Sequence, residues 1–193
     1  MLENCYQKEL PEAGCDEAGR GCLAGPVFAA AVMLPPDFSH PLLNDSKQMT
    51  ARQRDLLRAI VEREALAWVV KAVSAERIDQ INILQATYEA MRDAIAALMP
   101  APDLLLVDAV HIPEVETKQV GIIKGDAKSV SIAAASIIAK VTRDHMMMEM
   151  DALYPEYGFA GHKGYGAAKH IEAIKKYGPC PIHRRTFIKN FME

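Results

Sequence analysis

Two adjacent carboxylates, Asp16 and Glu17, stand directly before a glycine-rich turn that encloses a single arginine. An apolar stretch at 27–34 follows closely, so we expect the acidic pair to lie near the core. Like charges near a core are costly unless a cation neutralises them, and divalent metal ions prefer carboxylate oxygens. Gly19 and Gly21 have no Cβ, which allows a backbone, sugar or phosphate to approach closely. This segment predicts a metal site beside a docking surface for a phosphorylated ligand.

Two further carboxylates, Asp108 and Asp126, follow features of the chain that bring acids into sites. Asp108 ends the continuous apolar run that begins at Leu104, which is typical of a strand buried on both faces. Asp126 lies in a short polar segment before a long helix. Each also has a simpler interpretation, because Asp108 can terminate a strand and Asp126 can form an Asx-turn or cap the helix. Both interpretations stay open on the residues alone.

Composition narrows the class of protein. The chain has 193 residues, of which 50% are hydrophobic, and a formal net charge of −3. This balance argues against a protein that coats nucleic acid by charge alone, but it allows a local patch that binds nucleic acid. Such a patch is a candidate at 162–189, where basic residues gather and Glu172 is the only acid. A solvated basic face and a phosphate-binding surface both explain it.

The cysteines indicate a reducing compartment. Cys5, Cys15, Cys22 and Cys180 form no CxxC pair, which disfavours a zinc ribbon or a thioredoxin-like site. The N-terminus lacks the pattern of a signal peptide, and the apolar runs are too short to cross a bilayer. We therefore expect a cytoplasmic protein with no membrane partner.

The elements that must position these residues alternate between strands and helices. This order predicts an α/β protein, a mixed sheet with helices on its faces, in which sites gather at strand ends. Apolar patterns and caps predict strands at 12–16, 26–34, 66–73, 104–107 and 119–123, and helices from the N-cap Thr50 to 64, from Ser74 to 98 with a break near Asn82, at 130–153 and at 167–177.

At this point several segments, taken together, resemble ribonuclease HII. They occur in the family's order and at similar spacing, and the resemblance spans Gly14 to about Phe187. The segments are Asp16-Glu17-Ala18-Gly19-Arg20-Gly21, Asn44-Asp45-Ser46-Lys47, Val107-Asp108, Gly125-Asp126-Ala127-Lys128-Ser129 through to Arg143-Asp144, His162-Lys163-Gly164-Tyr165-Gly166 and His183-Arg184-Arg185.

The resemblance implies a ribonuclease H-like fold: a mixed five-stranded sheet flanked by helices, in one catalytic domain of residues 1–193. Residues from about 154 to 193 would form a C-terminal helical extension that binds substrate. The implied activity is that of an endonuclease that hydrolyses the RNA strand of RNA–DNA hybrids. It would also incise duplex DNA 5′ to single embedded ribonucleotides, leaving 3′-hydroxyl and 5′-phosphate ends.

The resemblance also implies a metal site formed by Asp16, Glu17, Asp108 and Asp126. Two Mg²⁺ or Mn²⁺ ions about 4 Å apart would activate the attacking water and stabilise the leaving oxygen. No protein nucleophile is then needed, and no Ser-His or Cys-His pair in the chain demands one.

Substrate contacts are implied in the same way. The Gly19-Arg20-Gly21 turn would read the 2′-hydroxyl through its main chain, and Tyr165 would stack on the sugar of the next nucleotide. Phosphate contacts fall to Lys47 and Lys163, with Lys128 and the Arg184-Arg185 pair as weaker candidates.

Three further positions can be compared with the pattern of the ribonuclease HII family. Asp144 also matches a family position, but an ion pair with Lys140 four residues earlier is a sufficient explanation for it. Cys15 stands where a small apolar residue is common. Ala167 stands where relatives often have threonine, which implies that one substrate hydrogen bond is absent.

Two other functions remain as alternatives: a nuclease of the same fold that acts on DNA or junctions, and a non-catalytic hybrid-binding protein. The Gly19-Arg20-Gly21 turn and Tyr165 disfavour the first, and the complete set of four acids disfavours the second. We expect a monomer, and no sliding-clamp motif is obvious after Phe187.

Overall fold

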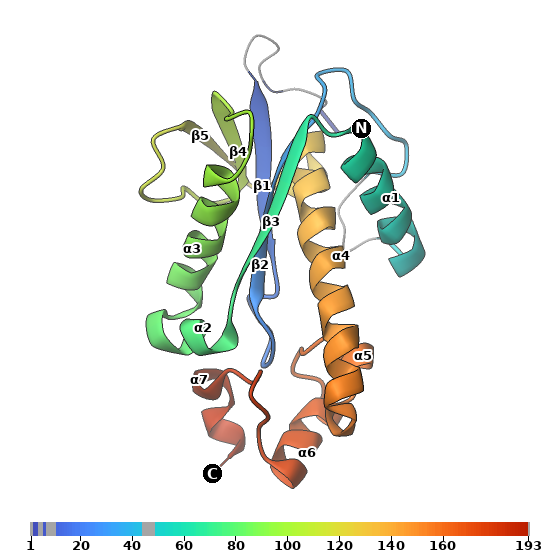
Figure 1. The fold of residues 1–193 in the computed structure, drawn as a ribbon, viewed down its shortest axis with the longest axis vertical. Helices are drawn as coiled ribbons and strands as arrows, with labels where there is room; N and C mark the ends of the chain where they lie inside the picture. The colour runs from blue at the N-terminus through green and yellow to red at the C-terminus, as the bar shows by residue number, and fades with distance from the viewer. Residues whose placement is uncertain (1, 4–5, 7–10, 44–48, 193) are drawn as a thin grey trace.

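A five-stranded mixed sheet forms the centre of the fold, in the order β3-β2-β1-β4-β5 (Figure 1). The computed structural model describes residues 2–3, 6, 11–43 and 49–192. β1 runs antiparallel to β2 and parallel to β4, so the predicted mixed sheet is confirmed. The strands are β1 (Glu12–Ala18), β2 (Val27–Met33), β3 (Ala67–Val73), β4 (Leu104–Asp108) and β5 (Lys118–Ile122).

Helices cover both faces of the sheet (Figure 1). The alternation of side chains along β1 and β4 sends Cys15 and Val107 into a core with Met91 of α3 (Ile83–Ala96). On the other face, α1 (Ala51–Glu64) and α4 (Val130–Leu153) enclose a second core with β2. β1 and β2 are therefore held between two apolar layers, which fixes their positions firmly.

Local caps set the helix ends, as the sequence predicts. Thr50 forms a capping box with Gln53 at the start of α1. Ser74 caps α2 (Ala75–Ile81), and Asn82 both ends α2 and accepts hydrogen bonds from the first residues of α3. The positive φ of 67° at Asn82 explains the break, because a helix cannot continue through that conformation.

The long helix α4 packs unusually close to β1. A Cβ at Gly14 would stand 2.1 Å from the Ser131 carbonyl carbon, so only glycine fits this crossing. The side chain of Ser129 caps the helix by accepting from Ile132 N at 3.3 Å. Asp126 is therefore not the N-cap of this helix.

Short helices complete the chain beyond α4. A third core joins Phe159 and Ile174 to Leu23, Ala24 and Met147, so the C-terminal segment packs on the loop after β1. None of the helices in the described part of the chain is both long and apolar enough to cross a membrane. The remaining elements are η2 (Gly125–Ala127), η3 (Pro155–Tyr157), α5 (Phe159–His162), α6 (Ala168–Tyr177), α7 (Arg185–Ile188) and η4 (Lys189–Phe191).

The predicted end of the first strand is wrong. β1 continues to Ala18 rather than ending at Asp16, because its ladder with β2 extends to the pair Ala18–Phe28. Asp16 and Glu17 therefore lie within the strand.

Candidate active site

Asp16 and Asp108 come from neighbouring parallel strands. The register pairs Cys15 with Val107. Asp16 and Asp108, the residues that follow, therefore lie side by side toward the same end of β1 and β4. Asp16 is only 6% exposed, and the Oδ1 atom of this side chain accepts a hydrogen bond from Glu17 N at 2.8 Å. The sheet itself therefore brings together two carboxylates that are 92 positions apart in the sequence (108 − 16).

Burial and neighbouring carboxylates raise the pKa of Asp16 and Glu17. Burial, and next the neighbouring Glu17 charge, hold the pKa of Asp16 well above its usual value of 3.8, and Asp108 adds to this effect. Burial also raises the pKa of Glu17, against the opposing effect of Arg20, whose Nη1 lies 3.4 Å from Glu17 Oε1. A bound cation would stabilise such a group of buried and partly buried carboxylates.

Asp108 is held by the segment that carries Asp126. Gly125 N donates to Asp108 Oδ1 at 2.7 Å, and a Cβ at Gly125 would stand 3.5 Å from that oxygen. Asp126 follows in η2, and its side chain is buried. The structure thus places the backbone of Asp126 beside Asp108, although the two residues come from different elements.

The donor set suits a hard cation, since all four side chains are carboxylates. They do not form a closed cage: within the described ranges, no three His, Cys, Asp or Glu side chains lie close enough together to hold a metal ion. The chemistry of these residues therefore fits a metal site, although the side chains do not converge on one point in this structure.

The two glycines of the turn after β1 have different surroundings. Gly19 has φ of +97°, and a Cβ there would stand 2.1 Å from Arg143 Nε. A Cβ at Gly21 would meet no atom within 4 Å. The fold therefore requires glycine at position 19, whereas nothing inside the protein requires it at position 21.

Tyr165 lies beside this turn. Gly164 O accepts hydrogen bonds from Leu23 N at 2.8 Å and from Ala24 N at 3.3 Å, which joins the two loops. Burial, and next the Cys22 thiol, raise the pKa of Tyr165, yet the residue is 43% exposed. The structure thus brings the turn and Tyr165 together with part of the aromatic ring accessible.

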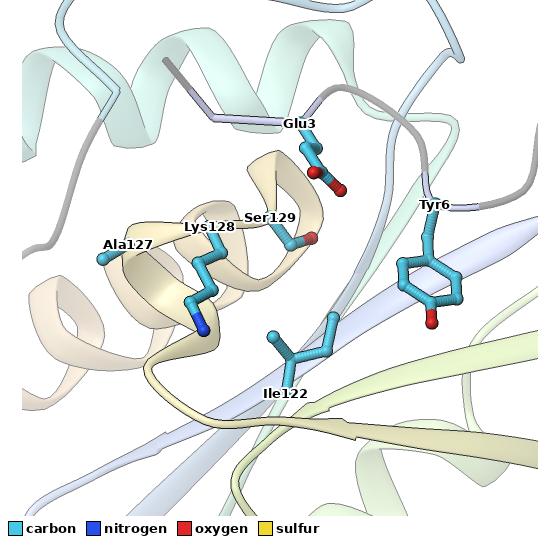
Figure 2. A pocket seen from close by; sticks show the side chains of 6 residues that line it. All are labelled: Glu3, Tyr6, Ile122, Ala127, Lys128 and Ser129. Carbon is cyan, nitrogen blue, oxygen red and sulfur yellow. The ribbon is translucent and has the colours of Figure 1, made fainter.

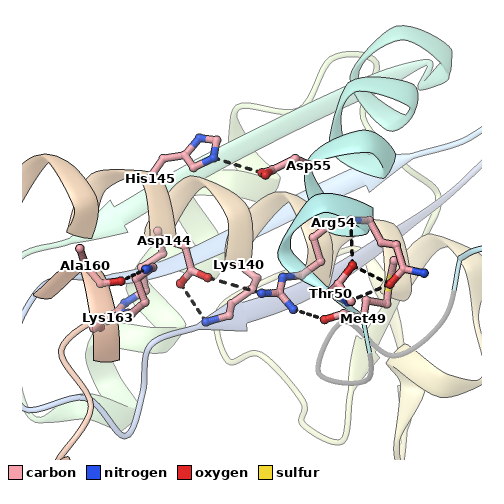
Figure 3. A network of polar contacts seen from close by, with 11 residues as sticks. Met49, Thr50, Arg54, Asp55, Lys140, Asp144, His145, Ala160 and Lys163 are labelled. Carbon is pink, nitrogen blue, oxygen red and sulfur yellow. Dashed lines mark hydrogen bonds and ion pairs between the residues drawn. The ribbon is translucent and has the colours of Figure 1, made fainter.

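A groove of about 360 Å³ runs past Tyr165 between α1 and α4. Asp144 lies in it and contacts Lys140 Nζ at 2.8 Å and Arg54 Nη2 at 4.0 Å (Figure 3). The predicted ion pair between Asp144 and Lys140 is confirmed. Lys163 lines the same groove and donates to the carbonyl of Ala160 (Figure 3).

The remaining basic candidates lie in different places. Lys128 is exposed and lines a separate hollow of about 300 Å³ beside η2, together with Glu3 and Tyr6 (Figure 2). Lys47 lies outside the described residues. Arg185 is exposed.

The expectation for Arg184 is wrong. Its side chain has no exposed surface, so it cannot contact a phosphate in this structure. Its guanidinium donates to the carbonyls of Gly19, Arg20 and Gly25 instead. Arg143, which the sequence analysis gave no role, is buried in the same way. A single sequence carries no signal that separates these two arginines from exposed ones.

Sequence reasoning also missed a chain of buried imidazoles. Cys180 N donates to His183 Nδ1 at 3.0 Å, and His170 Nδ1 lies 2.8 Å from the carbonyl of Tyr165. These partners assign the tautomers, so His183 Nε2 donates to His170 Nε2 across 3.0 Å. Both imidazoles are neutral in this arrangement, which ties the backbone of Tyr165 to the C-terminal segment.

The geometry agrees with known proteins. The family model for ribonuclease HII matches residues 13–190. The chain is 55% identical over 198 residues to ribonuclease HII of Acetivibrio thermocellus, covering 99% of this chain and 77% of that protein. Identity to ribonuclease HII of Lachnoclostridium phytofermentans is 58% over 189 residues, covering 96% and 74%. The crystal structure of ribonuclease H2 from Pyrococcus horikoshii OT3 superposes with a TM-score of 0.77 at 29% identity, covering 94% of this chain and 99% of that one.

Proposed function

The chain belongs to the ribonuclease HII family, as a metal-dependent endoribonuclease that cleaves RNA in RNA–DNA hybrids, and we propose that it also incises duplex DNA 5′ to single embedded ribonucleotides. One observation carries this proposal. A Cβ at Gly21 would enter open space, and Gly21 lies four residues after Glu17, the second of the two adjacent carboxylates. The turn that we propose to recognise the ribose therefore lies beside the carboxylates that we propose to support cleavage.

We propose that Asp16, Glu17, Asp108 and Asp126 hold two Mg²⁺ or Mn²⁺ ions. When bound, the ions supply Lewis-acid activation of the attacking water and stabilisation of the leaving 3′ oxygen. Asp16 and Asp108 contribute from adjacent strands, and the Gly125 N–H orients the Asp108 carboxylate. Products with a 3′-hydroxyl and a 5′-phosphate follow from hydrolysis at this bond.

Recognition of the ribose falls to the turn at Gly19-Arg20-Gly21. The 2′-hydroxyl is the group that distinguishes RNA from DNA, and it both donates and accepts hydrogen bonds. Arg20 and Gly21 are exposed, and the missing Cβ at Gly21 leaves room for a sugar to reach the main chain. Packing inside the protein does not require glycine at position 21, so we propose that the missing Cβ there serves the bound sugar.

Tyr165 would stack on the sugar of the next nucleotide, where a deoxyribose fits best. Lys140 Nζ lies 5.6 Å from the centre of its ring, and this cation stands at the edge of the groove that leads away from the turn. We propose that Lys163 contacts the phosphates of the strand in this groove, and that Lys47 does so from its own segment.

We propose that the enzyme is a monomer. Cys15, Cys22 and Cys180 are buried free thiols, as suits a reducing compartment, so we propose a cytoplasmic location.

The test is incision of a DNA duplex that contains one ribonucleotide, in the presence of Mg²⁺, with mapping of the cut site. We expect a single cut 5′ to the ribonucleotide and none in an all-DNA duplex of the same sequence. Equal cutting of the two duplexes would contradict the role in reading the ribose.

A further inference from the structure

Two arginines, Arg143 and Arg184, are completely buried without a carboxylate partner among the described residues. A buried cation is costly unless polar groups surround it. Each of these guanidiniums is instead stabilised by three main-chain carbonyls. Such an arrangement fixes the backbone that supplies the carbonyls.

Arg184 holds the turn that follows β1. Its Nη2 donates to Gly19 O at 2.7 Å and its Nη1 to Arg20 O at 2.8 Å. Its Nε donates to Gly25 O at 3.0 Å. One rigid planar group thus spans both ends of the loop, from a position 165 residues further along the chain.

The two inward carbonyls determine where the neighbouring N–H groups point. The peptide units after Gly19 and after Arg20 are trans, and in a planar trans peptide the C=O and N–H bonds point in opposite directions. Because both carbonyls point at Arg184, the N–H groups of Arg20 and Gly21 point away from it. Both residues are exposed, so these donors face the outside of the protein.

The charge of Arg184 strengthens the same donors. Burial lowers the pKa of this guanidinium from 12.5 to about 10, so it remains protonated at neutral pH. A cation on the carbonyl side polarises a peptide unit and makes its N–H a better hydrogen-bond donor. The orientation and the polarisation of the Arg20 and Gly21 N–H groups therefore both favour hydrogen bonds to a ligand outside the protein.

We infer that Arg184 is a positioning residue for ribose recognition, which holds the Arg20 and Gly21 N–H groups ready for the 2′-hydroxyl. This inference rests on the proposed function of the turn. Arg184 acts through the backbone of the turn and does not itself touch the substrate.

Arg143 provides an internal comparison. Its guanidinium donates to the carbonyls of Ala24, Pro26 and Lys163, at 2.9, 3.1 and 2.8 Å. It therefore fastens the end of the loop to the segment before Tyr165, and none of its hydrogen bonds reaches a carbonyl of the turn at Gly19 and Arg20. The two arginines are equally buried but orient different peptide units.

The experiment measures binding of the full-length protein in EDTA, where this metal-dependent enzyme does not cleave. The two probes are a duplex with one ribonucleotide and the all-deoxy duplex of the same sequence. The readout is the ratio of their dissociation constants, which isolates the contribution of one hydroxyl. For Arg184→Lys, which keeps the charge but cannot span three carbonyls, we expect this ratio to fall by about tenfold toward one.

A matched control separates positioning from general stability. Ile174 is fully buried in the C-terminal core, and its apolar side chain cannot donate a hydrogen bond to a carbonyl of the turn. Ile174→Ala should lower the melting temperature while leaving the ratio of dissociation constants unchanged. A ratio that falls equally in both variants would overturn the inference, as would an unchanged ratio in Arg184→Lys.

Circular dichroism shows whether Arg184→Lys is folded. If it is not, the wild-type protein decides, through the NMR resonance of the Arg184 Nε–H. We expect this resonance to shift more with the ribonucleotide-containing duplex than with the all-deoxy duplex, and equal shifts would overturn the inference. A ratio near one in the wild type would overturn the proposed function as well, whereas a high wild-type ratio that Arg184→Lys leaves unchanged removes only the role of Arg184.

Discussion

The two sides of the site are built in different ways. The carboxylates of Asp16 and Asp108 stand on adjacent strands, so the sheet places them directly. The turn at Gly19–Gly21 has no such scaffold, and it is held by the buried guanidinium of Arg184, which donates to the carbonyls of Gly19 and Arg20. The acidic side therefore depends on regular secondary structure, whereas the reading side depends on a few long-range hydrogen bonds. Mutations should separate the two sides into effects on cleavage and effects on selectivity.

The largest effect is expected from Asp108→Asn, which removes charge from the acidic side alone. Cleavage of hybrids and of single-ribonucleotide duplexes should fall by about a hundredfold or more, since each ~1.4 kcal/mol of lost transition-state stabilisation costs about a factor of ten in rate. Binding of an RNA–DNA hybrid in EDTA should stay close to that of the wild type. Residual activity above a few per cent would count against Asp108 as a shared metal ligand.

The two glycines of the turn give the next contrast. Gly21→Ala should leave the melting temperature unchanged, because its Cβ enters open space, but should reduce incision at single ribonucleotides by about tenfold. Gly19→Ala should lower the free energy of unfolding by about 1–3 kcal/mol, because its Cβ overlaps Arg143. Thermal unfolding and incision assays on both variants test this. A destabilised Gly21→Ala protein would break the distinction.

Tyr165→Ala should have a smaller and more selective effect. Loss of the aromatic ring should reduce incision at single ribonucleotides several-fold more than cleavage of long hybrids, because stacking on a base or sugar is worth about 1–3 kcal/mol. Tyr165→Phe serves as the control, since it keeps the ring and loses only the hydroxyl beside Cys22. An unchanged preference for single ribonucleotides over long hybrids in the alanine variant would exclude a role for Tyr165 in recognising the substrate.

The smallest effect on ribose selectivity is expected from pH, which acts on the stability of the segment that carries Tyr165. Burial lowers the pKa of both His170 and His183 from 6.5 to about 4. Between these values the unfolded chain binds more protons than the folded one, so stability should be full above pH 6.5 and decline as the pH falls toward 4. Urea unfolding across this range measures the decline. In His170→Gln, which lacks one of the two imidazoles, the pH-dependent part should shrink, and an unaltered profile would exclude this pair as its source.

The acidic side of the site could largely be predicted from the sequence, whereas the supports of the turn could not. The position of Asp108 is predictable because a continuous apolar run indicates a buried strand. The capping roles of Thr50, Ser74 and Asn82 are predictable because a cap depends on residues close by in the sequence. Arg184 is mispredicted because burial of a cation depends on carbonyls 165 positions away. The difference between Gly19 and Gly21 is likewise absent from the sequence, since it lies in what surrounds each Cα.

Family resemblance fills part of this gap. It groups Asp126 with Asp16 and Asp108, which periodicity cannot do, and the structure then places the backbone of Asp126 beside Asp108 through Gly125. It suggests roles for Tyr165 and the turn, but it does not say what holds them. Those supports consist of single long-range contacts, such as His170 to the carbonyl of Tyr165, that follow no periodic pattern.

The distance along the chain between the turn and Arg184 has a consequence during synthesis. At about 5–20 residues per second, the ribosome delivers Arg184 roughly 10 to 30 s after the turn has been made. The sheet strands that carry Asp16 and Asp108 are complete long before that. In a nascent chain, the guanidinium that holds the turn therefore becomes available only after both of these strands have been synthesised.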